Sequence, residues 1–135
     1  MNQDLDIRWK QRFQNYQKAV KQLKFAVAVT NPDVLQKQGV IQCFEYTFEL
    51  AWKTLQDFLS QRRGYDKTRG PRPVLEQAFQ DAIITDGITW FKMLESRNLT
   101  AHLYDEAEVE KIYQQIVHNY AALFIALEQF FGAQP

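Results

Sequence analysis

The C-terminal part of the chain carries an apolar stripe with the period of an α-helix. Between Asp105 and Phe131 the apolar residues recur at steps of 3, 4, 4, 3, 4 and 3, which places them on one face of a single helix. They are Val109, Ile112, Ile116, Tyr120, Leu123, Leu127 and Phe130. Asp105 begins this helix as an N-cap, with the acid Glu108 three residues later. So long an apolar face must pack against other helices, and this need constrains the fold more than any other feature.

Two earlier segments carry the same period. We expect a first helix over Asp4–Val29, ended by Asn31-Pro32-Asp33, and a second over about Asp33–Arg63 with Gly64 as its C-terminal stop. The apolar positions are Trp9, Phe13, Tyr16, Val20, Leu23 and Val27 in the first helix, and Ile41, Phe44, Phe48, Ala51, Trp52, Leu55, Phe58 and Leu59 in the second. Both helices therefore have one face suited to a common core.

A third helix is expected to be broken. Helical spacing runs from Val74 to Ile83, Gly87 interrupts it, and Ile88 to Leu94 resume it. No strand-like alternation and no internal repeat competes with this pattern. The chain has 135 residues, of which 46% are hydrophobic, a length and composition that suit one core. The sequence therefore predicts an all-α fold, an antiparallel bundle of four to five helices that forms a single domain over residues 1–135.

The second helix is apolar on two faces in its first half. Cys43, Tyr46 and Leu50 lie together opposite the main stripe at 100° per residue. Either the helix is buried between two neighbours of its own bundle, or this face meets another subunit, and the pattern leaves both open. Tyr46 is the aromatic residue for which we most expect a place at a subunit or partner surface.

The sequence lacks the features of a membrane or secreted protein. It has no run of 18 apolar residues and no leader with a small-residue cleavage site, and its lone Cys43 cannot form an internal disulfide. We therefore expect a cytoplasmic protein with no membrane contact.

The formal net charge is zero, so overall charge does not indicate a nucleic-acid-binding protein. One local stretch is basic, with a net charge of +4 over residues 62–72, and it is either an RNA-tracking surface or a solvated loop. Its basic residues are Arg62, Arg63, Lys67, Arg69 and Arg72. The acids Asp105, Glu106, Glu108 and Glu110 complement the dipole at the start of their helix, so we assign no metal. We also expect no cofactor.

Signatures of common enzyme classes are absent, including phosphate loops, paired-cysteine metal sites and nucleophile elbows. Of the two histidines, His118 lies off the apolar stripe and is expected to face solvent. His102 is different, because it follows Arg97 and Asn98 and precedes Tyr104 where the third helix ends. If the helix persists to His102, then Asn98 and His102 share one face.

A histidine can exchange a proton near neutral pH, and an arginine matches the geometry of phosphate oxygens. The pair suits metal-free phosphodiester chemistry. The alternative is that Arg97 and His102 only cap carbonyls at a helix end and complement its dipole. Spacing alone does not decide between these two interpretations.

Two motifs resemble a known family. Arg97-Asn98-x-x-x-His102-x-Tyr104 resembles the Arg-x4-His-x-Tyr signature of HEPN toxins, and Phe44-Glu45-Tyr46-Thr47-Phe48-Glu49-Leu50-Ala51-Trp52-Lys53 is similar to the second-helix stretch of the branch called nucleotidyltransferase substrate-binding proteins. The likeness spans nearly the whole chain and keeps both motifs in order. It implies a HEPN-like helical bundle that forms a homodimer and is encoded beside a minimal nucleotidyltransferase, as the toxin of a toxin-antitoxin module.

The resemblance also implies roles for residues. Arg97 and His102 of both protomers are expected to line a cleft at the dimer interface and to cut RNA without metal, and Asn98 matches the polar residue that follows the arginine. His102 would act as general base on a ribose 2′-OH, Arg97 would stabilise the phosphorane, and the product would be a 2′,3′-cyclic phosphate. The partner nucleotidyltransferase is expected to neutralise the toxin by transferring AMP to Tyr104.

Two other functions remain open at this point. The chain is alternatively a non-catalytic subunit that binds a nucleotide or another substrate for a two-component nucleotidyltransferase. In the third interpretation it is a plain helical interaction module, in which neither Arg97 nor His102 affects function.

Overall fold

The computed structural model describes residues 3–66, 70–103 and 105–135, and the regular structure in these ranges is entirely helical. The predicted all-α class is confirmed. The elements are α1 (Gln3–Val27), α2 (Val34–Arg63), α3 (Pro71–Gln80), α4 (Gly87–Leu99), the 3₁₀ turn η1 (Thr100–His102), α5 (Glu106–Gln115), the π-helical turn η2 (Ile116–Tyr120) and α6 (Ala121–Gly132).

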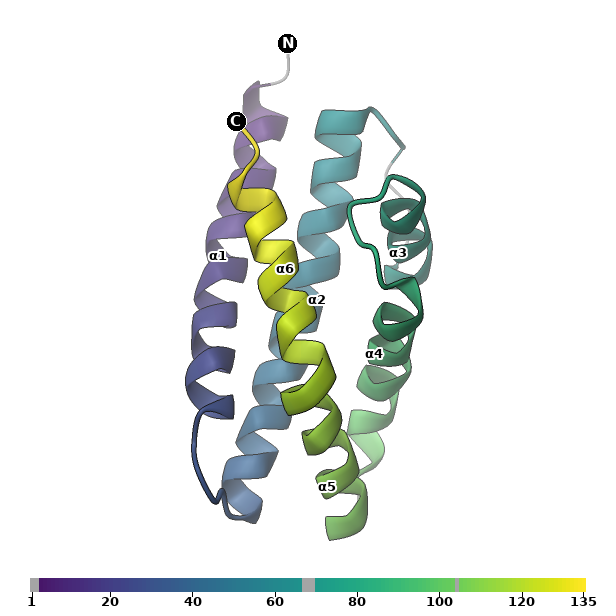
Figure 1. The fold of residues 1–135 in the computed structure, drawn as a ribbon. Coiled ribbons are helices and arrows are strands. Elements are labelled where there is room, and N and C mark those ends of the chain that lie inside the picture. Colours follow the sequence, from purple (N-terminus) through teal and green to yellow (C-terminus); the bar gives the residue numbers. More distant parts are fainter. Residues whose placement is uncertain (1–2, 67–69, 104) are drawn as a thin grey trace.

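The helices form an upright bundle (Figure 1). α1 and α2 pack as an antiparallel pair along most of their length, and α5, η2 and α6 follow one another as one continuous rod. This rod contacts α2 through α5 and α1 through α6. α3 and α4 complete the bundle on the other side of α2, and the start of α1 and the end of α6 lie at the same end of the bundle (Figure 1).

The ends of α2 follow from local sequence. Asp33 is the N-cap, and its side chain accepts a hydrogen bond from the backbone N–H of Gln36 at 2.7 Å while the Gln36 side chain accepts from the backbone N–H of Asp33. Gly64 ends the helix in the left-handed conformation, with φ of 74°, which glycine adopts without steric cost. Both boundaries agree with the predicted ones within a residue.

The interruption of the third helix lies earlier than Gly87. α3 ends at Gln80, and Ala82 has a φ of 58°, a left-handed turn that no glycine marks in the sequence. Ile83 and Ile84 belong to the connecting loop, although both are buried. The prediction that Ile83 continues the helix is therefore wrong. Ile83 is apolar because it is buried in the core from a loop, and its spacing from Phe79 happens to match that of a helix.

The C-terminal stripe shifts by one residue partway along. In the π turn η2 the backbone N–H of Ala121 bonds to the carbonyl of Ile116, which accommodates one extra residue in the helix. Beyond it Phe124 and Phe131 are fully buried, whereas Leu123 and Phe130, which the regular period predicts, are only partly buried. The predicted N-cap is confirmed, because the Asp105 side chain accepts from the Glu108 backbone N–H at 2.8 Å.

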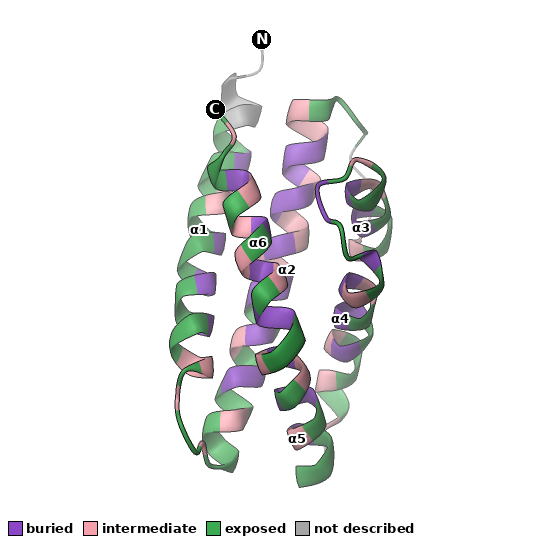
Figure 2. Cartoon of the chain, in the orientation of Figure 1, coloured by how far each residue is buried: buried purple, intermediate pink, exposed green. Residues whose placement is uncertain are grey.

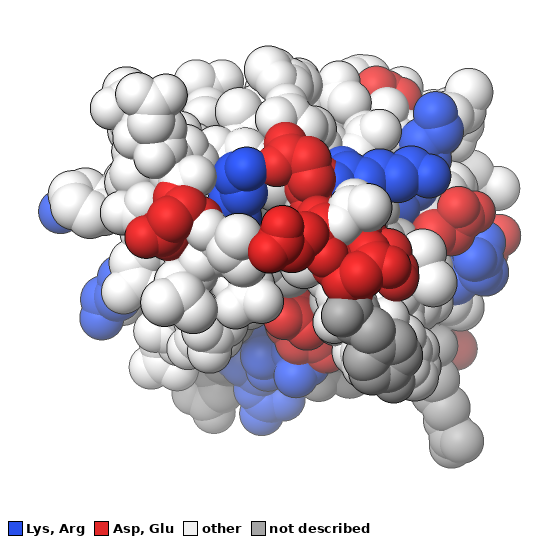
Figure 3. Space-filling view, turned by 90° about the horizontal axis from the view of Figure 1, so that it is seen from below, with Lys and Arg blue, Asp and Glu red and all other residues white. Residues whose placement is uncertain are grey.

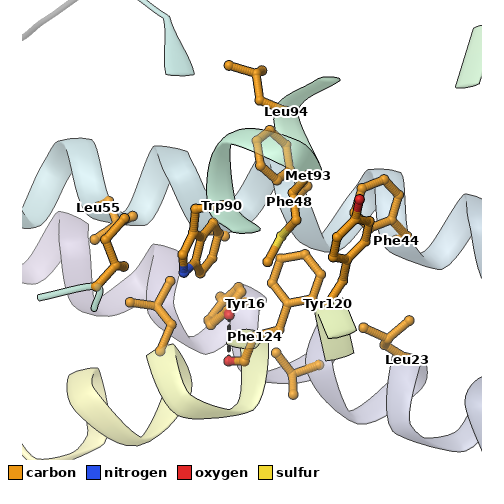
Figure 4. Packing of buried hydrophobic residues seen from close by; sticks show 14 of the residues in the cluster. Tyr16, Leu23, Phe44, Phe48, Leu55, Trp90, Met93, Leu94, Tyr120 and Phe124 are labelled. Carbon is orange, nitrogen blue, oxygen red and sulfur yellow. Dashed lines mark hydrogen bonds between the residues drawn. The ribbon is translucent and has the colours of Figure 1, made fainter. Parts of the chain in front are cut away.

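The core is rich in aromatic side chains (Figure 4). Trp90 meets Phe124 edge to face with ring centroids 5.6 Å apart, and Phe44 stacks on Tyr120 at 5.4 Å. The hydroxyl of Tyr16 donates to the carbonyl of Phe124 at 2.7 Å, so its burial leaves no polar cost. Buried residues lie between the helices and exposed ones face outward (Figure 2), so packing in the core sets how α2 and α4 lie relative to each other.

Candidate functional site

Arg97 lies in the last turn of α4, where a cation complements the helix dipole. Its side chain is 29% exposed. Nη2 donates to Glu49 Oε2 at 2.8 Å, and Nη1 donates to the side-chain oxygen of Asn98 at 3.0 Å. The guanidinium also lies over the ring of Phe48, 5.8 Å from its centroid. Because a guanidinium has five N–H donors, Arg97 can hold these acceptors and still bind phosphate oxygens.

Glu49, on α2, is the anionic partner of Arg97. Its Oε2 also accepts a hydrogen bond from Trp52 Nε1 at 3.0 Å. Partial burial favours the neutral carboxyl, but the hydrogen bonds from Arg97 and Trp52 and the charges of Arg97 and Lys53 outweigh it, and the pKa of Glu49 lies below its ordinary value. Glu49 therefore stays ionised, and its ion pair with Arg97 stays intact, at every pH down to the ordinary titration range of a carboxyl group.

His102 is carried by the 3₁₀ turn η1 and is exposed. α4 ends at Leu99, so it does not persist to His102, and each 3₁₀ residue turns by about 120° rather than 100°. Asn98 and His102 are therefore not neighbours on one α-helical face, the arrangement that a longer helix would have given. The Thr100 hydroxyl lies 2.8 Å from Glu45 Oε2 and 2.7 Å from the carbonyl of Arg97, and these contacts tie η1 to α2 and α4.

The structure brings some of the predicted residues together. Arg97 and Asn98 are in direct contact, and His102 follows on the turn that α4 runs into. Tyr104, the expected AMP acceptor, lies outside the described residues. His118 is exposed on η2, as predicted.

The basic stretch lies at the far end of α2 from these residues. Arg62 follows Glu49 by 13 residues on one helix, which is about 20 Å at 1.5 Å per residue. Lys67 and Arg69 lie outside the described residues. The described guanidinium groups contact Trp9 in the case of Arg62, Asp81 in the case of Arg63 and Phe91 in the case of Arg72.

The second apolar face of α2 is on the surface of the chain. Tyr46 is 63% exposed, whereas Cys43 and Leu50 are half-buried at the edge of the core, so this face is only partly covered by the rest of the bundle. Burial raises the pKa of the Cys43 thiol, which is therefore protonated at neutral pH and is a poor nucleophile. Beside Tyr46 and Leu50 is a hollow of about 390 Å³ that Glu49 also lines. The exposed face and the carboxylate that binds Arg97 are thus contiguous.

The end of the bundle where α4 stops and α5 begins is acidic in its centre, with basic side chains around it (Figure 3). Within residues 3–66, 70–103 and 105–135, no three His, Cys, Asp or Glu side chains are placed to hold a metal ion. In the same ranges every helix is too short or too polar to cross a bilayer.

Two residues that contact the candidate site, Glu45 and Glu49, have no role in the sequence-based prediction. A signal was present, because both lie four residues apart within the Phe44–Lys53 stretch that carries the family resemblance. Their partners on α4 and η1 are 48 and 55 residues away in the chain, and only the fold brings them together.

The chain is similar to known proteins in sequence and in fold. It is 31% identical over 81 residues to the probable ribonuclease HepT of Haemophilus influenzae, an alignment that covers 58% of this chain and 56% of that protein's length. A crystal structure of a protein from Thermus thermophilus superposes with a TM-score of 0.77 at 30% identity, covering 83% of this chain and 94% of the other. The model of the family described as nucleotidyltransferase substrate binding protein like matches residues 11–132. With nearly its whole length matched, the chain belongs to this nucleotidyltransferase substrate-binding family.

Proposed function

We propose that the protein is a HEPN-type toxin that cuts RNA without metal, with Arg97 and His102 as its catalytic residues. The observation that carries the proposal is the arrangement at the end of α4. Arg97 is held by Glu49 and Asn98, and the turn that follows carries an exposed histidine. The likeness to a relative named as a probable ribonuclease supports the same chemistry.

The chemistry needs a base and a charge-stabilising group. His102 takes the proton of a ribose 2′-OH, and the 2′-oxygen attacks the adjacent phosphorus. The bond from phosphorus to the 5′-oxygen breaks, the 5′-oxygen takes a proton back from the imidazolium, and a 2′,3′-cyclic phosphate remains. Arg97 stabilises the charge on the phosphorane oxygens, while Asn98, which accepts a hydrogen bond from Arg97, orients the phosphate through its side-chain N–H groups. DNA lacks the 2′-OH and is not cut.

The active form is a homodimer that uses the face of Tyr46 and Leu50. An exposed apolar face on a rigid helix is typical of an interface between subunits. The hollow at this face is also lined by Glu49, which binds Arg97, so a second copy docked there lies beside the catalytic arginine. The two catalytic sites then face one cleft between the protomers.

A minimal nucleotidyltransferase is the proposed partner, in line with the family's description. It silences the toxin by transferring AMP to Tyr104, two residues from His102. The added phosphate and nucleoside would occupy and repel the position of the RNA phosphate.

Co-expression tests the Tyr104 modification. After expression with the neighbouring nucleotidyltransferase, the intact mass of the protein is expected to rise by whole adenylate units, and the mass of the Tyr104→Phe variant is expected to stay unchanged. An equal increase in the variant would assign the modification to another residue.

A second candidate function follows from the family's description itself, which names substrate binding rather than cleavage. The protein would then present a nucleotide to its partner enzyme with no turnover of its own. Binding of nucleotide by a dimer that leaves RNA intact is the result that favours this candidate.

The two histidines allow a matched test of the ribonuclease. Mixed RNA is incubated in chelator with wild-type protein expressed without its partner, and with the His102→Ala and His118→Ala variants. Both histidines are exposed, so either loss is expected to leave folding intact. We expect cleavage by the wild-type protein and by His118→Ala, and none by His102→Ala. Equal cleavage by both variants would remove His102 from the mechanism.

A further inference from the structure

Two carboxylates on α2 hold the residues that lead to His102. Glu45 and Glu49 are four residues apart, so they lie one above the other on the same face of the helix. Glu49 accepts from Arg97 at 2.8 Å, and Glu45 accepts from the Thr100 hydroxyl at 2.8 Å. The first contact fixes the end of α4, and the second fixes η1.

We propose that Glu49 and Glu45 are positioning residues of the catalytic site, Glu49 for the guanidinium of Arg97 and Glu45 for the turn that carries His102. This inference rests on the proposed ribonuclease function. Neither carboxylate is assigned to the reaction itself, because each acts through another residue.

Glu49 restricts the rotamers of the long Arg97 side chain. An arginine side chain has many rotamers, and ordering one at the moment of reaction costs free energy. Here the Arg97 guanidinium is held by Glu49 at Nη2 and by Asn98 at Nη1, above the ring of Phe48. Glu49 is itself anchored by Trp52 Nε1. The donors of Arg97 are thus oriented before RNA binds, which is the condition for strong electrostatic stabilisation of a transition state.

Glu45 fixes the position of the turn η1. η1 is a single 3₁₀ turn of three residues, too short to hold its own shape. The Thr100 hydroxyl lies within hydrogen-bond distance of Glu45 on α2 and of the carbonyl of Arg97 on α4, and its single hydrogen is shared between these two acceptors. One side chain therefore couples the turn that carries His102 to the helix end that carries Arg97.

These contacts do not hold the fold together. The Arg97 and Glu49 side chains are 29% and 37% exposed, and ion pairs at such exposure contribute little to the free energy of unfolding. Glu45 is exposed as well. These polar contacts join the end of α4 and the turn η1 to α2 but add little to stability. They therefore fit a role in orienting Arg97 and the turn that carries His102.

The test compares kinetic constants for the variants Glu49→Ala, Glu49→Gln, Glu45→Ala and Glu95→Gln. Glu95 is an exposed acid on α4, two residues before Arg97, so its loss controls for removing a negative charge near the site. We expect Glu49→Ala to lower kcat by about 100-fold with the KM for RNA unchanged, because misplacement of a catalytic group by about 1 Å costs that much. Glu45→Ala is expected to lower kcat by about tenfold, and Glu95→Gln not at all.

A second readout follows Arg97 directly. The side-chain ¹⁵N resonances of Arg97 are expected to show restricted guanidinium rotation in the wild-type protein and faster rotation in Glu49→Ala. Glu49→Gln keeps an oxygen acceptor and is expected to restore most of both kcat and the restriction. A merely structural role would instead lower the melting temperature and leave Arg97 restricted in the folded fraction.

The experiment distinguishes an error in the positioning role of Glu49 from an error in the proposed ribonuclease function. If the wild-type protein cuts RNA and Glu49→Ala cuts it equally well, the positioning role is wrong and the ribonuclease stands. If the wild-type protein leaves RNA intact, both fall together. Loss of kcat in Glu49→Ala with recovery in Glu49→Gln supports the inference.

Discussion

Replacing Arg97 with Ala is expected to lower the rate of RNA cleavage by about 100- to 1,000-fold, the usual cost of losing a donor that stabilises transition-state charge. The same change is expected to lower the free energy of unfolding by no more than about 1 kcal/mol, because its ion pair with Glu49 is partly exposed. Activity is measured at saturating RNA, and stability by urea unfolding.

The chain contains a matched control for this variant. Arg63, in the last turn of α2, pairs with Asp81 at 2.9 Å and lies over Phe58 at 5.8 Å, so it makes the same two kinds of contact as Arg97, an ion pair and a contact with a phenylalanine ring. Arg63→Ala is expected to change stability by a similar amount and to leave the rate at saturating RNA unchanged. Equal loss of activity in both variants would show that the ion pair matters for folding rather than for catalysis.

The second large effect is expected at the face of Tyr46 and Leu50. Leu50→Glu places a carboxylate where the proposed dimer buries an apolar side chain, and burying an unpaired charge costs free energy. Because the dimer is two-fold symmetric, this free-energy cost is paid twice per dimer. We expect a monomer by light scattering, with helical content unchanged and RNA cleavage lost. Leu50 is half-buried at the edge of the core within a single chain, so circular dichroism and urea unfolding check that the Leu50→Glu protomer is folded before its oligomeric state is compared.

Ile88→Glu is the control for this interface variant. Ile88 is an apolar residue on α4 that is 74% exposed, and it does not line the hollow beside Tyr46. It is expected to stay dimeric and active. A Leu50→Glu protein that remains a dimer would place the interface on another face, and an active monomer would show that each protomer cuts RNA alone.

Much of the fold could be predicted from local sequence signals. Helix periods and helix caps depend on residues within a few positions of one another, and they identified α2 from Asp33 to Gly64 within a residue. The predictions of helix bounds and burial fail where a local sequence pattern fits more than one backbone conformation. Ala82 adopts a left-handed turn that usually signals glycine, and the π turn η2 transfers burial to Phe124 and Phe131.

The candidate site also contains residues that the sequence could predict and residues that only the fold brings together. Arg97, Asn98 and His102 lie within one short motif, so the sequence could place them together. Glu49 could not be assigned a role from spacing, because it meets Arg97 across 48 residues of chain through the packing of α2 and α4. The same packing decides that Tyr46 is exposed, a point that the two apolar faces of α2 left open.

The central claim is that His102 and Arg97 promote attack by a ribose 2′-OH, and the ends of the RNA fragments test it most directly. Mixed RNA is digested in chelator by the wild-type protein, and the fragments are analysed by mass spectrometry. The mechanism predicts 2′,3′-cyclic phosphates on one side of each cut and 5′-hydroxyls on the other, with no fragments from the His102→Ala protein. Fragments that end in 3′-hydroxyl and 5′-phosphate groups, or RNA that stays intact, would contradict it.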